Sequence, residues 1–296
     1  MRMPEGRVSL PQGSLYRETA GMQRDSWRPA SDDLRGVIDL LYSVQVGAAR
    51  SAAVPDGRAG LVWVTDGALW VFGPQTTAWR PSRSAVSVTG ARLSPGVAHA
   101  VLGVPAHELR DRQVRAADLW GRPALGMEAA LAGAAGEAER LGVLERVVRH
   151  RLAVAGIGID PVARLVANRL AEASVTAGAL AAEASLSPRQ LRRRCQAASG
   201  YSPSALARVL RLQRFLRLAS MDRRRPLSQM AATAGYSDQA HLARDCRQLT
   251  GFSPSQLRAA VPAEWASRPG VFPVRTSAPQ AVMAKADQGW VRTSTA

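Results

Sequence analysis

The chain has 296 residues, which is enough for two domains, and it carries a formal net charge of +16 at pH 7. No apolar run reaches membrane-spanning length and no secretory signal opens the sequence, so we expect a cytoplasmic location and no membrane partner. The charge is concentrated, because residues 186–260 hold 14 arginines against three acidic residues, a local net charge of +11. Such a surface favours a polyanionic partner bound in a salt-sensitive way.

Residues 1–125 have the pattern of short β-strands. Two runs, 60–64 and 68–72, flank Thr65-Asp66-Gly67, which is typical of a β-hairpin. Alternation places Trp70 and Phe72 on one face of the second run. Further strands are expected over residues 37–46, 85–88 and 91–93. The sum predicts a small β-rich barrel or sandwich.

Aromatic side chains in this region are candidates for a pocket that holds a small organic effector. They are Trp63, Trp70, Phe72 and Trp79. The same side chains would serve equally well as core residues, so both interpretations stay open. A metal site would need a cluster of His and carboxylate ligands, and this region offers mainly His99, His107 and Glu108. We therefore expect neither a metal nor a cofactor.

Residues 128–152 are alanine-rich with approximate helical spacing of their apolar positions, among them Leu131, Leu141 and Val148. This helix would pack on the β-rich domain or on its copy in a second subunit. We assign residues 126–158 to a helical linker. A break at Gly156-Ile-Gly158 follows, and Asp160-Pro161 then caps a helix that opens the next domain.

Two stretches of the C-terminal half repeat each other at a constant offset of 51 residues. The matching pairs are Leu191 with Leu242, Arg193 with Arg244, Cys195 with Cys246, Gly200 with Gly251, and Pro203 with Pro254. A repeat this regular indicates one structural unit made twice. It suits a periodic ligand, of which DNA is the obvious example.

Each copy has the pattern of a helix-turn-helix. In the first, residues 176–183 form a helix, 184–186 the turn, and Ser187 caps a second helix that starts at Pro188. In the second, residues 227–233 form a helix, 234–237 the turn, and Asp238 is the cap, where its carboxylate complements the positive helix end. Leu191 with Cys195, and Leu242 with Cys246, have the i, i+4 spacing of a buried stripe.

The opposite stripes of the two second helices predict the DNA contacts. Arginine can bond a guanine edge bidentately and glutamine an adenine edge, whereas alanine can touch a thymine methyl group. The candidates are Arg189, Gln190, Arg192 and Arg193 in the first copy, and Gln239, Ala240, Ala243 and Arg244 in the second. Any one arginine could instead belong to a solvated face or grip a phosphate. We also expect the two helices to lie about 34 Å apart, one turn of DNA.

These residues resemble the DNA-binding domain of AraC/XylS-type transcription regulators. The second copy carries most of the match, with residues 231–238, Leu242, Arg244 and residues 251–258. The resemblance covers about residues 160–260 and implies two helix-turn-helix subdomains joined by a long helix, here from Pro203 to about Ser220. The family usually has phenylalanine where this chain has Cys195 and Cys246. We interpret both cysteines as small buried apolar side chains without a redox role.

The family also bears on the N-terminal half, where its members often carry a cupin-like sensory barrel. Residues 54–57, 73–74, 93–96 and 102–121 look like the N-terminal domain of an uncharacterised AraC-type subgroup. Some regulators with this DNA-binding domain resemble alkyl-transfer enzymes that need a reactive cysteine in the N-terminal half. This chain has no cysteine before Cys195, so we do not expect an enzyme.

The expected fold class is α+β, with a β-rich cupin-like domain over residues 1–125, the linker, a DNA-binding domain over 159–262 and a disordered tail over 263–296. The expected function is a sequence-specific transcription regulator that binds double-stranded DNA and responds to a small-molecule effector, with RNA polymerase and a homodimer as further partners. The alternative is a DNA-binding module whose N-terminal domain mediates protein contacts without a ligand. The sequence leaves open the effector, the operator, the sign of regulation and the oligomeric state.

Overall fold

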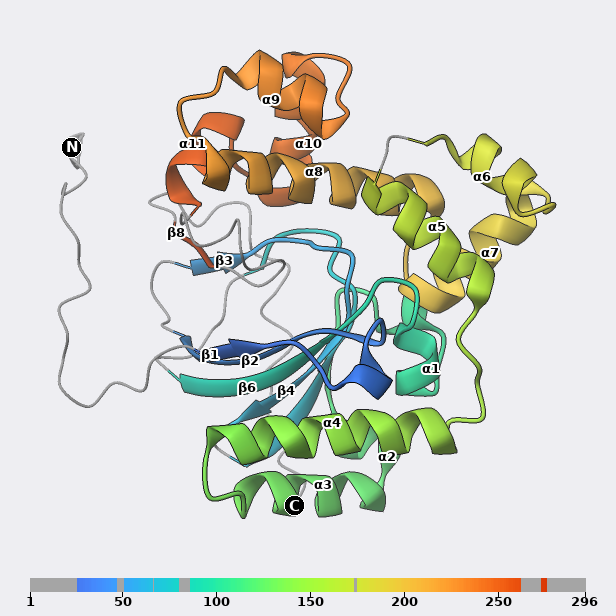
Figure 1. The fold of residues 1–296 in the computed structure, drawn as a ribbon, viewed down its shortest axis with the longest axis vertical. Helices are drawn as coiled ribbons and strands as arrows, with labels where there is room; N and C mark the ends of the chain where they lie inside the picture. The colour runs from blue at the N-terminus through green and yellow to red at the C-terminus, as the bar shows by residue number, and fades with distance from the viewer. Residues whose placement is uncertain are drawn as a thin grey trace, which may run out of the picture.

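A computed structural model describes residues 26–46, 51–65, 67–79, 86–172, 175–261 and 273–275 of the chain. An antiparallel sheet with covering helices comes first, and a helical region follows it (Figure 1). The predicted α+β class is confirmed.

One six-stranded antiparallel sheet organises the N-terminal part. In spatial order its strands are β1 (Ser26–Arg28), β2 (Ile38–Val46), β6 (Val86–Leu93), β4 (Gly60–Val64), β5 (Ala68–Phe72) and β7 (Gln113–Arg115). The predicted hairpin is present, since Val64 pairs with Ala68 and Gly60 with Phe72. The runs 85–88 and 91–93, predicted as two strands, fall in the single strand β6, apart from residue 85, which lies outside the described residues. Strand β6 pairs with β2 almost along its whole length.

Helices cover one face of this sheet. They are α1 (Ala98–Leu102), α2 (Ala116–Trp120), α3 (Arg122–Ala132) and α4 (Glu137–Val154), with the 3-10 turns η1 (Asp32–Leu34) and η2 (Ala106–Leu109). Alternate strand residues such as Leu41, Leu61 and Leu69 form one core with Leu131 of α3 and Leu144 of α4. Among the described residues the sheet is open, with β1 and β7 at its edges, and not the closed barrel or two-sheet sandwich that the strand pattern suggested. The helices take the place of a second sheet.

The continuous helix expected over residues 128–152 is in fact two helices. Helix α3 ends at Ala132 and α4 begins at Glu137, and Gly133 and Gly136 lie in the connection. Glycine costs about 1 kcal/mol relative to alanine inside a helix, so a break is favoured here. Both helices pack into the core of the sheet, so the segment assigned to a linker is part of the N-terminal layer.

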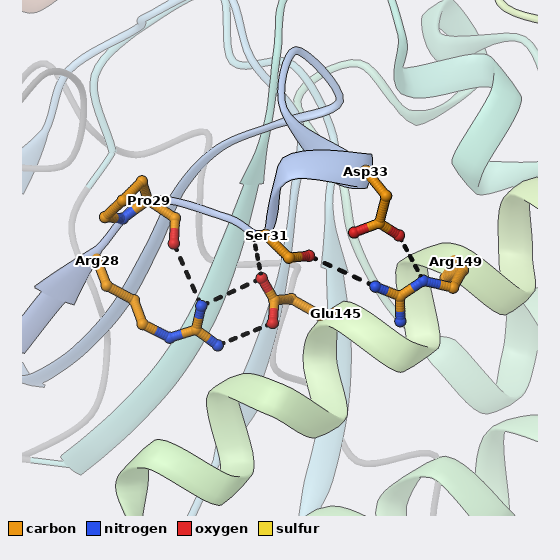
Figure 2. Close-up of polar contacts among 6 residues, drawn as sticks. All are labelled: Arg28, Pro29, Ser31, Asp33, Glu145 and Arg149. Carbon is orange, nitrogen blue, oxygen red and sulfur yellow. Dashed lines mark hydrogen bonds and ion pairs between the residues drawn. The ribbon is translucent and has the colours of Figure 1, made fainter.

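A polar cluster fastens the edge of the sheet to α4 (Figure 2). Arg28 of β1 donates two hydrogen bonds, of 3.1 and 2.9 Å, to the Glu145 carboxylate, and the backbone N–H of Ser31 donates a third of 2.7 Å. Burial opposes ionisation of Glu145, but these hydrogen bonds outweigh it and lower its pKa. One turn further along α4, Arg149 Nε lies 2.7 Å from an oxygen of Asp33. The two ion pairs fix the position of α4 across the sheet.

The second region is helical. Its elements are α5 (Pro161–Glu172), α6 (Ala177–Glu183), α7 (Pro188–Ser199), α8 (Pro203–Met221), α9 (Leu227–Ala234), α10 (Gln239–Thr250) and α11 (Pro254–Ala260). They share a single core that includes Leu191, Phe215 and Leu242. The long helix α8 lies on the side of the sheet opposite α3 and α4 (Figure 1).

The predicted disordered tail lies mostly outside the described residues. Its described part, β8 (Pro273–Arg275), pairs with β3 (Ser51–Ala53) in a small antiparallel ladder, so the tail contains a strand at that point. Within the helices that the structure describes, none combines the length and apolar character needed to cross a membrane.

Candidate nucleic-acid interface

Helix α7 begins with a complete capping box. Ser187 Oγ accepts a hydrogen bond from the Gln190 N–H at 3.3 Å, and Gln190 Oε1 accepts one from the Ser187 N–H at 2.9 Å. Pro188 occupies the first helical position, as its missing N–H predicts. Because the capping box occupies Gln190 Oε1, the side-chain nitrogen of Gln190 is the group that can donate a hydrogen bond to a ligand.

The two faces of α7 divide as predicted from the spacing. Leu191 and Cys195 are each 1% exposed and belong to the helical core. Arg189, Arg192 and Arg193 are exposed. Together with Gln190 and Gln196 they line a shallow open depression. Gln196 was not predicted, although it lies three residues beyond Arg193 on the same stripe.

Helix α10 is the equivalent element of the second unit. Gly235 ends α9 at a φ of +90°, in the left-handed region that glycine tolerates. Asp238 Oδ1 then accepts a hydrogen bond from the His241 N–H at 2.6 Å, and this bond is the main reason that the pKa of Asp238 is lowered. Leu242 and Cys246 are fully buried.

The outward face of α10 carries the predicted set. Gln239, Ala240 and Arg244 are exposed, while Ala243 is half-buried. Arg247, one turn beyond Ala243, is also exposed and was not predicted. This face therefore offers fewer hydrogen-bond donors near its start than the face of α7.

The repeat extends further than the sequence pattern indicated. Ser199 Oγ donates to the Cys195 carbonyl at 2.8 Å and Thr250 Oγ1 donates to the Cys246 carbonyl at 2.6 Å. Each hydroxyl also accepts the N–H two residues later, from Tyr201 and Phe252 respectively. Ser199 and Thr250 also obey the offset of 51 residues, but because the residue types differ the pair is not evident from sequence identity.

Helix α8 connects the two units through Arg214. Its guanidinium donates to the Leu170 carbonyl at the end of α5, at 2.6 Å, and to the Ala234 carbonyl at the end of α9, at 3.0 Å. A cation at a helix C-terminus satisfies carbonyls that have no partner within the helix. One side chain therefore serves both units.

An ion pair orients α7 itself. Arg194, on the flank between the buried and exposed stripes, bonds Asp160 through two nitrogens at 2.7 and 2.8 Å. Asp160 also accepts the Val162 and Ala163 N–H groups at the start of α5. Arg194 thus belongs to the scaffold, while its neighbours Arg192 and Arg193 face outward.

Both cysteines are buried and free, in separate units. Burial is the main cause that raises the pKa of Cys195 to about 11 and that of Cys246 to about 12. A thiol of this kind stays neutral and unreactive near neutral pH.

The four aromatic residues expected to form a pocket lie on different faces of the sheet. Trp63 points into the core beneath the helices, where the Arg140 guanidinium lies 5.1 Å from its ring centroid. Trp70 and Phe72 pack on the opposite face, with Tyr42 and Val62. The ring of Trp79 is 5.5 Å from that of Phe72. The structure thus brings Trp70, Phe72 and Trp79 to one face and separates Trp63 from them.

Comparison with known proteins gives two family matches. A model described as "Helix-turn-helix domain" matches residues 180–260, and one described as "Domain of unknown function (DUF6597)" matches residues 27–115. No curated protein matches the chain.

Several solved structures are similar to parts of the chain. The C-terminal domain of AraT, a response regulator from Geobacillus stearothermophilus, is 22% identical over 34% of this chain and 85% of its own, with a TM-score of 0.32. A probable AraC family transcriptional regulator from Rhodopseudomonas palustris is 28% identical over 34% of this chain and 94% of its own, with a TM-score of 0.30. ToxT from Vibrio cholerae is 8% identical over 75% of this chain and 98% of its own, with a TM-score of 0.41.

The doubled unit, its exposed basic stripe and the family matches agree on one assignment. The chain thus carries a helix-turn-helix domain of the AraC type over residues 180–260, preceded by a DUF6597 domain over residues 27–115.

Proposed function

We propose that this chain reads double-stranded DNA through the first two turns of both α7 and α10, and that its N-terminal domain responds to a small organic effector. The supporting observation is the division of each recognition helix into a fully buried stripe and an exposed polar one. In α7 the exposed stripe is Arg189, Gln190, Arg192 and Arg193. In α10 the corresponding stripe is Gln239, Ala240 and Arg244 with the half-buried Ala243.

The chemistry of the two stripes suits base edges in the major groove. Guanidinium groups match the two acceptors of guanine, and the Gln239 amide matches adenine. The exposed arginines at the start of α7 also attract the phosphate backbone, so affinity is expected to fall with salt. Partners that follow from this role are double-stranded DNA and RNA polymerase, with a homodimer as a further expectation.

For the effector, we propose the face of the sheet that carries Trp70, Phe72 and Trp79. These rings form an apolar aromatic surface, so a planar, largely apolar molecule fits their chemistry. The alternative is that these rings are core residues and that the N-terminal domain makes protein contacts without a ligand.

Genomic footprinting of the full chain tests the DNA proposal. The bound fragments should share a sequence, and Arg192→Ala should reduce their retention. Arg146→Ala removes an exposed arginine from α4, on the other side of the sheet, and serves as the matched control. Equal retention of the fragments by the wild type and by Arg192→Ala would contradict the proposal. So would a set of bound fragments that share no common sequence.

A thermal-shift screen of small aromatic compounds tests the effector. A compound that binds the folded state raises the midpoint with its concentration. The shift should disappear in Trp79→Ala and persist in Leu125→Ala, which alters an exposed side chain on α3. If every shift survives Trp79→Ala, the aromatic face is not the site and the protein-contact alternative is favoured.

A further inference from the structure

An extended segment of the N-terminal domain contacts both helix-turn-helix units. It comprises residues 73–79, which follow β5, and we call it the strap. Its own domain holds it firmly. Thr76 donates two hydrogen bonds of 2.6 Å to the Asp111 carboxylate, from its N–H and its hydroxyl. Trp79 exchanges two backbone hydrogen bonds with Ala53, at 3.0 and 2.8 Å.

The first contact of the strap is with the C-terminal end of α7. The hydroxyl of Tyr201, whose side chain is 1% exposed, donates to the Gln75 carbonyl at 2.6 Å. Pro74 packs against Gly200 so closely that a Cβ at that glycine would come within 2.6 Å of the proline ring. Arg110, from the neighbouring loop, donates to the Gly200 carbonyl at 2.8 Å. The end of the first recognition helix is thus seated on the N-terminal domain.

The second contact is with the C-terminal end of α10. The Ala78 N–H donates to the Leu249 carbonyl at 2.8 Å. Gln75 and Ala78 are three residues apart, and three extended residues span at most about 10 Å. The two recognition helices are therefore attached at their ends to points on one short, held segment.

We propose that the strap fixes the position of α7 relative to α10 and so determines which spacing of two DNA half-sites the protein accepts. This inference rests on the proposal that these helices read DNA. It adds a role for the N-terminal domain that does not need a ligand. The strap could also transmit the effect of a bound ligand to the recognition helices, because it ends at Trp79, whose ring packs on Phe72. A molecule that displaced Trp79 would act on the same attachment.

The repeat provides a matched substitution. Phe252 occupies the place of Tyr201 in the second unit, 51 residues later, and is likewise buried. Tyr201→Phe therefore gives the first unit a side chain that the second unit already accommodates, and it removes only the hydroxyl that reaches Gln75. Thr77→Ala is the control, since Thr77 lies within the strap but is exposed.

A second pair of variants tests the packing of Pro74. Gly200 and Gly251 have φ values of +81° and +77°, so alanine is strained at both. At Gly200 the new Cβ also meets Pro74. Gly200→Ala should therefore loosen the attachment beyond what Gly251→Ala does, and the shared backbone strain cancels in the comparison.

The decisive measurement is the distance between spin labels in the full chain without DNA. Labels at Ala182→Cys on α6 and Thr233→Cys on α9 occupy exposed positions, one in each unit. The native cysteines are buried and stay unlabelled. We expect one narrow distance distribution in the otherwise unaltered chain and in Thr77→Ala, and a broader or shifted one in Tyr201→Phe and Gly200→Ala. Unchanged distributions in both strap variants would overturn the proposal.

Binding to DNA with varied half-site spacing gives the functional readout. The unaltered chain should prefer one spacing, and Tyr201→Phe should lose that preference while keeping its preference at each half-site. A chain that binds no DNA at any spacing would defeat the proposed function, while the label distances would still decide the role of the strap. A spacing preference that survives in Tyr201→Phe counts against the strap alone.

Discussion

Asp245 of α10 is 5% exposed and accepts a hydrogen bond of 3.0 Å from Nε of Arg208 on α8. A second cation of α8, Arg211, lies 3.6 Å from its other oxygen. One buried carboxylate thus anchors the second recognition helix to two arginines of the connecting helix. These ion pairs add directional contacts to the apolar packing of Leu242 and Cys246 in the helical core.

Removing this carboxylate should destabilise the protein. Asp245→Ala removes the carboxylate that pairs with two arginines that are themselves partly exposed, so it should lower the free energy of unfolding by about 1–3 kcal/mol. Urea denaturation measures the loss. Asp118→Ala, at an exposed position of α2, should change stability by less than about 0.5 kcal/mol. Equal stabilities for the two variants would show that the ion pair contributes nothing.

Arg192 and Arg193 should each contribute to base recognition. Replacement of either by alanine should weaken binding by about 1–3 kcal/mol and relax the preference at one base position. Titrations against operators that differ at single base pairs, repeated over a range of salt, distinguish the two possible roles. A uniform loss on all sequences with a shallower salt dependence would assign that arginine to a phosphate.

The half-site beneath α10 should tolerate base changes better than the half-site beneath α7. Ala240 and Ala243 cannot hydrogen-bond a base edge, so thymine methyl contact or groove shape is what remains at those places. Saturation mutagenesis of the operator, scored for each half-site separately, gives the comparison. The opposite ranking would mean that Gln239, Arg244 or Arg247 carries more of the specificity than the stripe suggests.

Both thiols should be inert in the folded protein. Burial raises the pKa of Cys195 to about 11 and that of Cys246 to about 12, so the reactive thiolate is scarce near neutral pH. A chromogenic disulfide reagent should react slowly with the native chain and rapidly with both cysteines in denaturant. Fast reaction of one thiol before unfolding would indicate local opening around that helix.

The ion pair between Asp33 and Arg149 should give the stability an acid dependence. The hydrogen bond from Arg149 is the main reason that the pKa of Asp33 falls from 3.8 to about 2. A carboxyl group with a lowered pKa in the folded state stabilises that state above its unfolded pKa and ceases to do so as the pH falls through the folded value. The melting temperature of the unaltered chain should therefore exceed that of Asp33→Asn above pH 3.8, and the gap should close towards pH 2. A gap that stays constant over this range would rule out the assigned pKa.

The helix-turn-helix units could be predicted from the sequence because their signals are local. Ser187, Pro188, Gly235 and Asp238 act within a few residues of their own position, and the buried pairs follow helical periodicity. The same holds for the hairpin of β4 and β5, whose loop is short. In each case the interaction that decides the structure lies within a few residues of the sequence signal.

Predictions that depended on distant contacts were less successful. Trp63 lies opposite Leu69 in the hairpin and therefore shares its face, away from Trp70. The pairing register of the hairpin predicts this separation, whereas aromatic character alone does not distinguish Trp63 from Trp70, Phe72 and Trp79. The prediction of a single helix over residues 128–152 is wrong because the chain breaks at Gly133 and Gly136, near the start of this stretch. No local sequence signal predicts the contact of the strap with the helix-turn-helix units, since Gln75 and Tyr201 are 126 residues apart.

Arg214 also has a consequence for how the DNA-binding region unfolds. Its guanidinium bonds carbonyls near the ends of α5 and α9 at once, so an unfolding event that displaces this part of α8 removes a contact from both units. The two helix-turn-helix units are therefore expected to unfold in one transition and not in two independent ones, even though the sequence repeats. Their shared core, from Leu191 through Phe215 to Leu242, has the same effect. A duplicated motif is in this way expected to unfold as one cooperative unit in which α8 belongs to both halves.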